Sequence, residues 1–303
     1  MTTLLTNGVS SAIPLILVTL GGIIAERAGV MSVSLEGYML TGAFAAVAVS
    51  HTGGIWLGLA AAAAAGGIVG LVHASLCVSA RVNQIISGLA INLFALGITG
   101  FLDPVIFGAG NTGVQVPAFS NLKIPGLGSI PVVGPALFDQ PMFAYLAIVL
   151  VVLVSLYFRY TRSGLALHAV GEMPAAAEAR GISVVRTRYA ATVISGVLGG
   201  VGGAALSIGV VNSFVENMTA GRGYIALAAV VFAGWRPLIA AAACLLFGIA
   251  DAAQVSLNVL GVHVATELLA MAPYVVTVLA LIILGRRGRA PAGLGLAFVR
   301  GQR

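Results

Sequence analysis

Long apolar stretches separated by short polar segments dominate the chain. Most of them approach the roughly 20 residues that an α-helix needs to cross about 30 Å of hydrocarbon. The stretch 224–235 is too short to cross alone, and glycines and Pro237 interrupt its surroundings, so we interpret it as part of a broken helix. The apolar stretches cover residues 9–25, 35–50, 56–79, 84–107, 141–158, 189–211, 224–235, 237–254 and 265–285.

Counting the short stretch as a crossing predicts an all-α polytopic membrane protein with about nine transmembrane helices, within a range of about eight to ten. The composition agrees, because 59% of the residues are hydrophobic and only 8% are charged, whereas about a quarter are charged in soluble proteins. The mean hydropathy is +1.08. We interpret the net charge of +6 as a signal of membrane orientation, not of nucleic-acid binding.

The polar segment from about 159 to 188 carries five of the chain's fifteen basic residues. Short basic loops collect in the cytoplasm, which puts this segment and the basic C-terminus inside and the N-terminus outside. Pro174 suits a first helical turn, the alanines after it propagate a helix, and Gly181 suits its end. We therefore expect a short exposed helix at the inner face of the membrane, although such a loop can also simply connect two helices.

On the opposite side we expect the loop from about 108 to 140, which is rich in glycine and proline. Its many apolar residues favour partial packing on the helix bundle, as a cap or a docking surface. We expect no separate soluble domain, so that residues 1–303 form a single transmembrane domain.

The first two apolar stretches are joined by residues 26–37, which are too few and too apolar for an ordinary loop. In one interpretation, Ser34 caps the following helix while Glu36 lies in its positive first turn. In the other, the segment is the break of a discontinuous helix, a device by which transporters place free backbone groups at membrane depth.

Small residues recur every four positions in two of the predicted spans. Such stripes let helix backbones approach closely in lipid, so they predict tight packing and no chemistry. The stripes are Gly58, Ala62, Gly66, Gly70 and Ala74 in the third span, and Ser195, Gly199, Gly203 and Ser207 in the sixth.

Polar residues inside spans indicate either interhelical hydrogen bonds or a polar pathway, because an amide at membrane depth needs a partner or water. Gln84 and Asn92 share a helical face, and Asp251 allows the same two interpretations. The polar segment 212–224 contains Glu216 and Arg222, which either pair or face solvent, and is either a surface loop or a gate. The candidate pathway residues are Asn83, Gln84, Asn92, Asn212, Glu216 and Asp251.

Motifs for chemistry of the chain's own are missing. The sequence has no phosphate-binding G-x-x-x-x-G-K-[ST] loop, and its sole lysine is Lys123. It also has no H-E-x-x-H motif, and its four histidines are scattered. Cys77 and Cys244 fall inside apolar stretches and suggest no disulfide framework. We therefore do not expect an enzyme, and we expect no cofactor.

Four segments together give nearly the whole chain a resemblance to the permeases of bacterial ABC importers of the branched-chain amino acid, ribose and nucleoside group. The chain is most similar to the shorter permease of nucleoside and simple-sugar systems. Met173 departs from the Asn that often stands there, and Ser32 and Ser34 replace commoner residues. The segments are ERAGVMSVSLEGYMLTGAF at 26–44, VNQIISGLAINLFALG at 82–97, AVGEMPAAAEARGI at 169–182 and ENMTAGRGYIALAAVVFAGWRP at 216–237.

The resemblance implies that a helix over 171–182 is the coupling element that fits a groove on a separate ATPase subunit, which uses the ATP. It also implies a second, homologous permease in a heterodimer, an extracytoplasmic solute-binding protein, and a bacterial inner (cytoplasmic) membrane location with a cytoplasmic C-terminus. The coupling residues are then Gly171, Glu172, Met173, Pro174, Ala176, Ala177, Glu178 and Gly181.

The expected function is that of a permease subunit that translocates a nucleoside or a simple sugar, since amide side chains suit ribose hydroxyls and base edges more than charged groups. Two alternatives stay open. The first is a branched-chain amino acid ABC permease. The second, from a different class, is a self-sufficient secondary transporter.

Overall fold

The computed structural model describes residues 2–108, 114–117, 119, 121–123, 138–259 and 289–299. The predicted ninth span, 265–285, lies outside the described residues, as does most of the loop 108–140. The helices of the described part are α1 Thr2–Arg27, α2 Leu35–Gly53, α3 Ile55–Ala74, α4 Gln84–Phe107, α6 Met142–Tyr160, α7 Arg162–Glu172, α8 Pro174–Ala179, α9 Val184–Leu206, α10 Arg222–Phe232 and α11 Pro237–Val259, with the π-helical turns η1 Ser75–Ser79 and η2 Ser207–Val211.

The structure confirms the helical membrane class but not nine crossings. Within the described residues, six helices are long and apolar enough to cross a membrane. They correspond to α1, α3 with η1, α4, α6, α9 with η2, and α11. A short two-stranded ribbon pairs β1 Asn121–Lys123 antiparallel with β2 Asp139–Pro141, and Ser10 of α1 reaches Gln140 of this ribbon.

Helix α10 confirms the short, broken helix predicted around 224–235. Its 11 residues span only about 16 Å at about 1.5 Å per residue, half of the hydrocarbon thickness. The chain between η2 and α10 turns through left-handed conformations at Asn212, Asn217 and Ala220. A second left-handed turn, at Gly234 and Trp235, separates α10 from α11.

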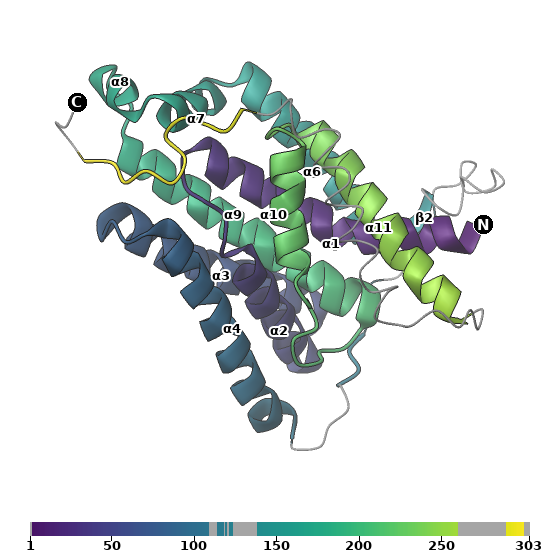
Figure 1. The fold of residues 1–303 in the computed structure, drawn as a ribbon. Coiled ribbons are helices and arrows are strands. Elements are labelled where there is room, and N and C mark those ends of the chain that lie inside the picture. Colours follow the sequence, from purple (N-terminus) through teal and green to yellow (C-terminus); the bar gives the residue numbers. More distant parts are fainter. Residues whose placement is uncertain are drawn as a thin grey trace.

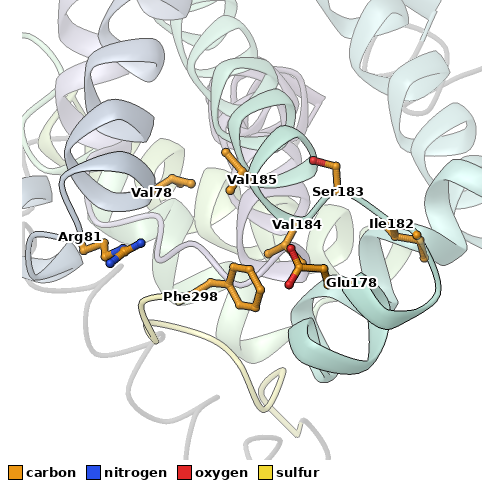
Figure 2. A pocket seen from close by; sticks show the side chains of 9 residues that line it. Val78, Arg81, Glu178, Ile182, Ser183, Val184, Val185 and Phe298 are labelled. Atoms are coloured by element: carbon orange, nitrogen blue, oxygen red, sulfur yellow. The ribbon is translucent and has the colours of Figure 1, made fainter. Parts of the chain in front are cut away.

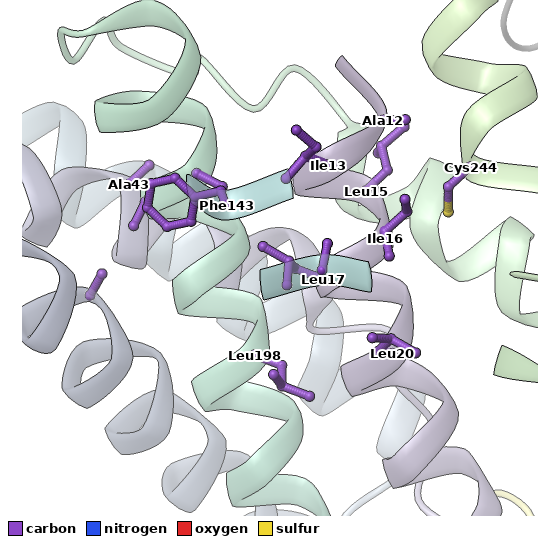
Figure 3. Packing of buried hydrophobic residues seen from close by; sticks show 14 of the residues in the cluster. Ala12, Ile13, Leu15, Ile16, Leu17, Leu20, Ala43, Phe143, Leu198 and Cys244 are labelled. Carbon is purple, nitrogen blue, oxygen red and sulfur yellow. The ribbon is translucent and has the colours of Figure 1, made fainter. Parts of the chain in front are cut away.

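Helices α1, α2 and α9 form the interior of the bundle, and the other long helices surround them (Figure 1). Apolar side chains of α1 make the largest buried cluster with residues of α9, α6 and α11. Figure 3 shows Leu17 and Leu20 on α1 facing the space shared with Leu198 and Phe143, with Cys244 of α11 on the far side of α1. This packing holds α2 between α3, α4 and α9.

The glycine stripes pack against partners inside this chain. A side chain on Gly66 of α3 would collide with the Gly196 carbonyl of α9, and one on Gly70 would approach the Gly196 Cα to 3.1 Å. On the α2 side, a side chain on Gly203 would come within 2.6 Å of the Ala43 backbone nitrogen. The predicted close packing is therefore confirmed, and it joins α9 to both α3 and α2.

One end of the bundle gathers the basic polar elements. Helices α7 and α8 lie there, together with the C-terminal segment 289–299, which Figure 1 draws in yellow beside them. The ends of α1 and α3 reach the same place, because Arg27 contacts His168 of α7 and Ser79 contacts Tyr189 of α9. We call this the loop end of the bundle.

Two Gly→Ala substitutions should have opposite effects, one inside the α3–α9 contact and one on α4, outside it. Gly196→Ala puts a methyl group against the Gly66 carbonyl, so we expect about 1–3 kcal/mol of destabilisation from overpacking. Gly97 of α4 has no atom within 4 Å of a built Cβ, and Gly97→Ala should be neutral or stabilising by up to about 1 kcal/mol through helix propensity. Thermal unfolding of the purified chains in detergent measures both effects, and equal midpoints for the two variants would contradict this packing.

Candidate functional site

The break between α1 and α2 is built around Glu26. Its carboxylate accepts a hydrogen bond from the Trp235 indole N–H at 2.7 Å and one from the Ser32 backbone N–H at 3.3 Å. The Ser34 side chain makes no capping hydrogen bond to α2, so the capping interpretation is wrong for Ser34. Residues 28–34 form a short non-helical segment between α1 and α2, which we call the break, and side chains of Glu26 and of α4 hold its backbone.

Glu36, in the first turn of α2, joins that helix to α10. Its Oε1 accepts hydrogen bonds from the Thr219 hydroxyl at 2.6 Å and the Gly221 N–H at 2.9 Å, and its Oε2 accepts one from the Gly223 N–H at 2.6 Å. The side chain is buried. Because the N-termini of α2 and α10 both carry positive partial charge, the buried carboxylate is stabilised by two helix ends at once. Gly223 is required here, since a Cβ on it would lie 2.5 Å from the Glu36 Cα.

The amides of α4 bind the same break. Gln84 Oε1 accepts a hydrogen bond from the Met31 N–H at 2.7 Å. Asn92 Oδ1 accepts one from the Gly37 N–H at 2.8 Å, while its Nδ2 donates to the Val33 carbonyl and to the Tyr224 hydroxyl. Of the two interpretations of these amides, interhelical bonding is therefore what the structure shows.

Asn83 has a different position from the other α4 amide residues. It is the N-cap of α4, and its Oδ1 accepts hydrogen bonds from the Ile85 and Ile86 N–H groups at 3.0 and 3.2 Å. Its side chain is exposed at the helix end, where capping accounts for an Asn.

Two charges of the segment 212–224 do not pair with each other. Arg222 forms an ion pair with Asp251 of α11 at 3.3 Å, with both side chains a little over a quarter exposed. Glu216 is exposed and lies beside Gly100 of α4, where an added Cβ would come within 3.0 Å of its carboxylate. Asn212 ends η2 in a left-handed conformation, and its carbonyl accepts a hydrogen bond from the Val116 N–H.

The loop helix is shorter than the predicted 171–182. Helix α8 begins at Pro174, and Gly181 follows its end with φ +83°, which confirms the predicted start and stop residues. Gly171 and Glu172, however, belong to the end of α7. Met173 separates the two helices with φ −140° and ψ 78°, because the ring of a following proline disfavours the helical conformation.

Only part of the alanine face of α8 is available to a partner. Ala176 is exposed, and Met173 beside it is 69% exposed. Ala177 is buried against Val170 and Val184 within this chain. A bulky residue at Ala177 would therefore clash with side chains of this chain itself.

Arg188 ties the loop end to the α1–α2 break. It is 1% exposed, and its guanidinium donates to the carbonyls of Ala28 at 3.2 Å, Leu296 at 2.7 Å and Gly293 at 3.3 Å. The Gly293 N–H donates in turn to the Gly171 carbonyl at 2.7 Å. We call residues 289–299 the C-terminal strap, because these bonds fasten it across α7 and the break.

Arg27 and His168 make a second link at this end. Arg27 donates to the Trp235 carbonyl and to the His168 Nδ1, the latter at 2.9 Å. Burial lowers the pKa of His168 to about 4, and the charge of Arg27 acts in the same direction. The imidazole is therefore neutral at physiological pH and accepts the Arg27 hydrogen bond.

A pocket of about 320 Å³ opens between α8, the end of η1 and the C-terminal strap (Figure 2). Arg81 lies on one side of it and Glu178 on the other, with Phe298 of the strap between them. The remaining lining is mostly aliphatic, from Val78, Ile182, Val184 and Val185. Among the described residues, no group of three His, Cys, Asp or Glu side chains is arranged to hold a metal ion.

Sequence reasoning missed Arg188, Trp235, His73 and Tyr224. Arg188 lies at the edge of an apolar stretch. A charged side chain in that position needs hydrogen-bond partners, and this was the signal that could have identified it. His73 of α3 contacts the Ser87 hydroxyl and the Met31 carbonyl, so a third helix contacts the break. Nothing in the sequence pattern pointed to the contacts of Trp235 or Tyr224.

The family model described as "Branched-chain amino acid transport system / permease component" matches residues 4–284. The chain is 39% identical to the guanosine ABC transporter permease protein NupQ of Bacillus subtilis, over 96% of this chain and 95% of that protein. It is 36% identical to the nucleoside ABC transporter permease protein NupC of Lactococcus lactis, over 95% and 93% of the two chains. It is 40% identical to the putative glucose ABC transporter permease protein TsgC13 of Haloferax volcanii, over 83% and 76%. No solved structure matches the chain.

The Glu36 contacts predict a graded loss of stability. Glu36→Gln removes the charge and turns an amide group toward backbone N–H donors, so we expect a loss of about 1.5–3 kcal/mol. Thr219→Val removes one of the three donors and should cost about 1 kcal/mol. Glu216→Gln, an exposed change in the same segment, is the matched control and should unfold like the parent chain. Thermal unfolding in detergent measures the series, and a wild-type midpoint for Glu36→Gln would refute the structural role of this carboxylate.

Proposed function

Because the chain belongs to the permease component family of the branched-chain amino acid transport system, we propose that it is the transmembrane subunit of an ATP-driven importer for a nucleoside or a simple sugar. The observation that carries the proposal is near full-length similarity to guanosine and nucleoside ABC transporter permeases. Similarity to a putative glucose permease keeps simple sugars in the substrate class. As a permease, the chain is a transport subunit and not an enzyme.

The proposed partners follow from what the chain lacks and exposes. It has no phosphate-binding loop motif, so ATP is hydrolysed by a separate ATPase subunit. A solute-binding protein delivers the solute on the outer side. A second, homologous permease completes the pathway, and the broad exposed apolar face of α4 is a candidate surface for it. That face includes Leu89, Leu93, Phe94, Phe101 and Val105.

The proposed membrane topology puts the loop end in the cytoplasm. Arg27, Arg81 and the arginines around α7 and α8 gather there, as the charge rule for short loops requires. The C-terminus is then cytoplasmic, as expected from the sequence. The pass count includes the six long helices, the discontinuous α2 and α10, and the apolar stretch 265–285, in one transmembrane domain of residues 1–303 in a bacterial inner membrane.

We assign coupling to α8 and the residues around it. Exposed Met173 and Ala176 support this assignment, since a partner can reach them. Gly171 and Glu172, at the end of α7, act through the C-terminal strap. The Gly171 carbonyl accepts a hydrogen bond from the Gly293 N–H, and the Glu172 carboxylate accepts one from the Ala292 N–H. Movement of the ATPase then reaches the break through Arg188. Pro174, Ala177, Glu178 and Gly181 set the position of the helix.

Transport in proteoliposomes tests the proposed function. The chain is reconstituted with its ATPase, second permease and solute-binding protein, and uptake of guanosine, glucose and leucine is compared with and without ATP. We expect ATP-dependent uptake of guanosine or another nucleoside, or of the sugar, and none of leucine. Uptake of leucine alone would favour the amino-acid alternative, and uptake by this chain alone driven by an ion gradient would favour the secondary transporter.

An exposed bulky substitution tests the coupling assignment. Ala176→Trp adds a large ring on the exposed face of α8, so it should obstruct docking of the ATPase while the chain inserts normally. Leu165→Trp is the matched control, because Leu165 is 59% exposed on α7 and lies outside the coupling residues. We expect Ala176→Trp to lose at least about nine-tenths of both transport and stimulated ATPase activity, as a misfit in a well-packed contact costs about 1–3 kcal/mol. Full activity at normal abundance would leave α8 as a simple connector.

A further inference from the structure

The polar segment between η2 and α10 lies at mid-depth in the bundle. It runs along α4 from Asn92, which bonds the Tyr224 hydroxyl, to Gly100, which faces Glu216. Both α4 residues lie within about 7 Å of the middle of Gln84–Phe107, at a rise of about 1.5 Å per residue. The part of the segment at Glu216 and Tyr224 therefore lies away from both ends of that helix.

Two polar residues of this segment are exposed beside the second half of α4. Glu216 and Asn217 are both exposed, and Asp103 of α4, which interacts electrostatically with Glu216, is half-buried. A carboxylate does not face hydrocarbon without a large cost, so acids at this depth face water or protein. This surface therefore faces water or a partner subunit, not the lipid.

Tyr224 adds a partly exposed aromatic ring next to α4. It is 42% exposed at the start of α10. Its hydroxyl accepts a hydrogen bond from Asn92 Nδ2 at 2.9 Å, and that amide is itself held by Val33 and Gly37. With the hydroxyl anchored to α4 and the backbone in the first turn of α10, the ring has little freedom to turn. A pre-positioned ring loses little conformational entropy when it binds.

We propose that Tyr224 is a solute-contacting residue, with its ring face stacking on the base of a nucleoside in transit and Glu216 accepting a hydrogen bond from it. A nucleoside has a base π-face for the ring, and ribose hydroxyl or base amino groups for the carboxylate. The two acids at this surface disfavour anions, so nucleotides and other phosphorylated solutes are excluded. The inference rests on the proposed function, because it names the part of the solute that this surface binds.

The test uses the full transporter reconstituted with its partners and saturating solute-binding protein loaded with guanosine. Two quantities are measured: stimulated ATPase activity, and guanosine transported per ATP hydrolysed. The variants are Tyr224→Leu, which removes the ring, and Tyr224→Phe and Tyr224→Trp, which keep one. Val231→Ala is the control, since Val231 is 41% exposed two turns further along the same face of α10.

We expect Tyr224→Leu to lower guanosine transported per ATP about tenfold, the factor given by a typical base–aromatic stacking energy, while ATPase stimulation stays unchanged. Without the ring, solute released into the pathway would return to the outer side before it is carried across. The Phe and Trp variants should keep most of the transport, and Val231→Ala all of it.

Three results would overturn the inference. The first is wild-type transport per ATP by Tyr224→Leu. The second is an equal fall of transport and ATPase stimulation, which would make Tyr224 a packing or subunit-contact residue. The third is an equal loss in the Phe and Leu variants, which would assign the effect to the Asn92 hydrogen bond. A wild-type complex that carries neither nucleoside nor sugar would instead refute the proposed function itself.

Discussion

The arrangement of α2 and α10 depends on one buried carboxylate. A buried charge is costly unless it is fully hydrogen-bonded, and Glu36 obtains three donors from the segment that leads into α10. Two helix N-termini add their positive ends. Helix α2 can begin inside the protein because this contact exists, and α10 is oriented by the same contact. Gly223 is needed because a side chain on it would collide with Glu36, and Gly221 because its backbone is left-handed, with φ +84°.

The loop end and the break are parts of one hydrogen-bonded unit. Arg188 joins the start of α9 to Ala28 and to the C-terminal strap, and the strap is bonded to Gly171. A displacement of α7 and α8 therefore moves the strap, or else breaks bonds to a buried guanidinium, which is costly. The strap therefore connects the end of α7 to the start of α9 and to the break, and we include it with α8 in the proposed coupling region.

Local signals were predictable from the sequence and distant contacts were not. Hydropathy located the long helices, and Pro174 and Gly181 located α8, because these depend on neighbouring residues. The glycine stripes predicted close packing but could not say that α9 meets both α3 and α2. The partners of Glu36 and Arg188 lie more than 100 residues away, so no local pattern shows them. The Ser34 cap failed because Glu36 and Asn92 already fix the start of α2.

The amides of α4 show why a polar residue in a span does not by itself identify a solute contact. An amide buried in a low dielectric must be paired in every state of the protein, and Asn92 spends both of its amide hydrogens on Val33 and Tyr224. A residue that is paired in this way fixes the positions of the neighbouring segments. The side chains that remain available to a passing solute are those that are exposed near the middle of the bundle and are not used up in such hydrogen bonds. Positioning and contact are thereby divided between neighbouring residues: Asn92 fixes the ring of Tyr224, and the ring meets the solute.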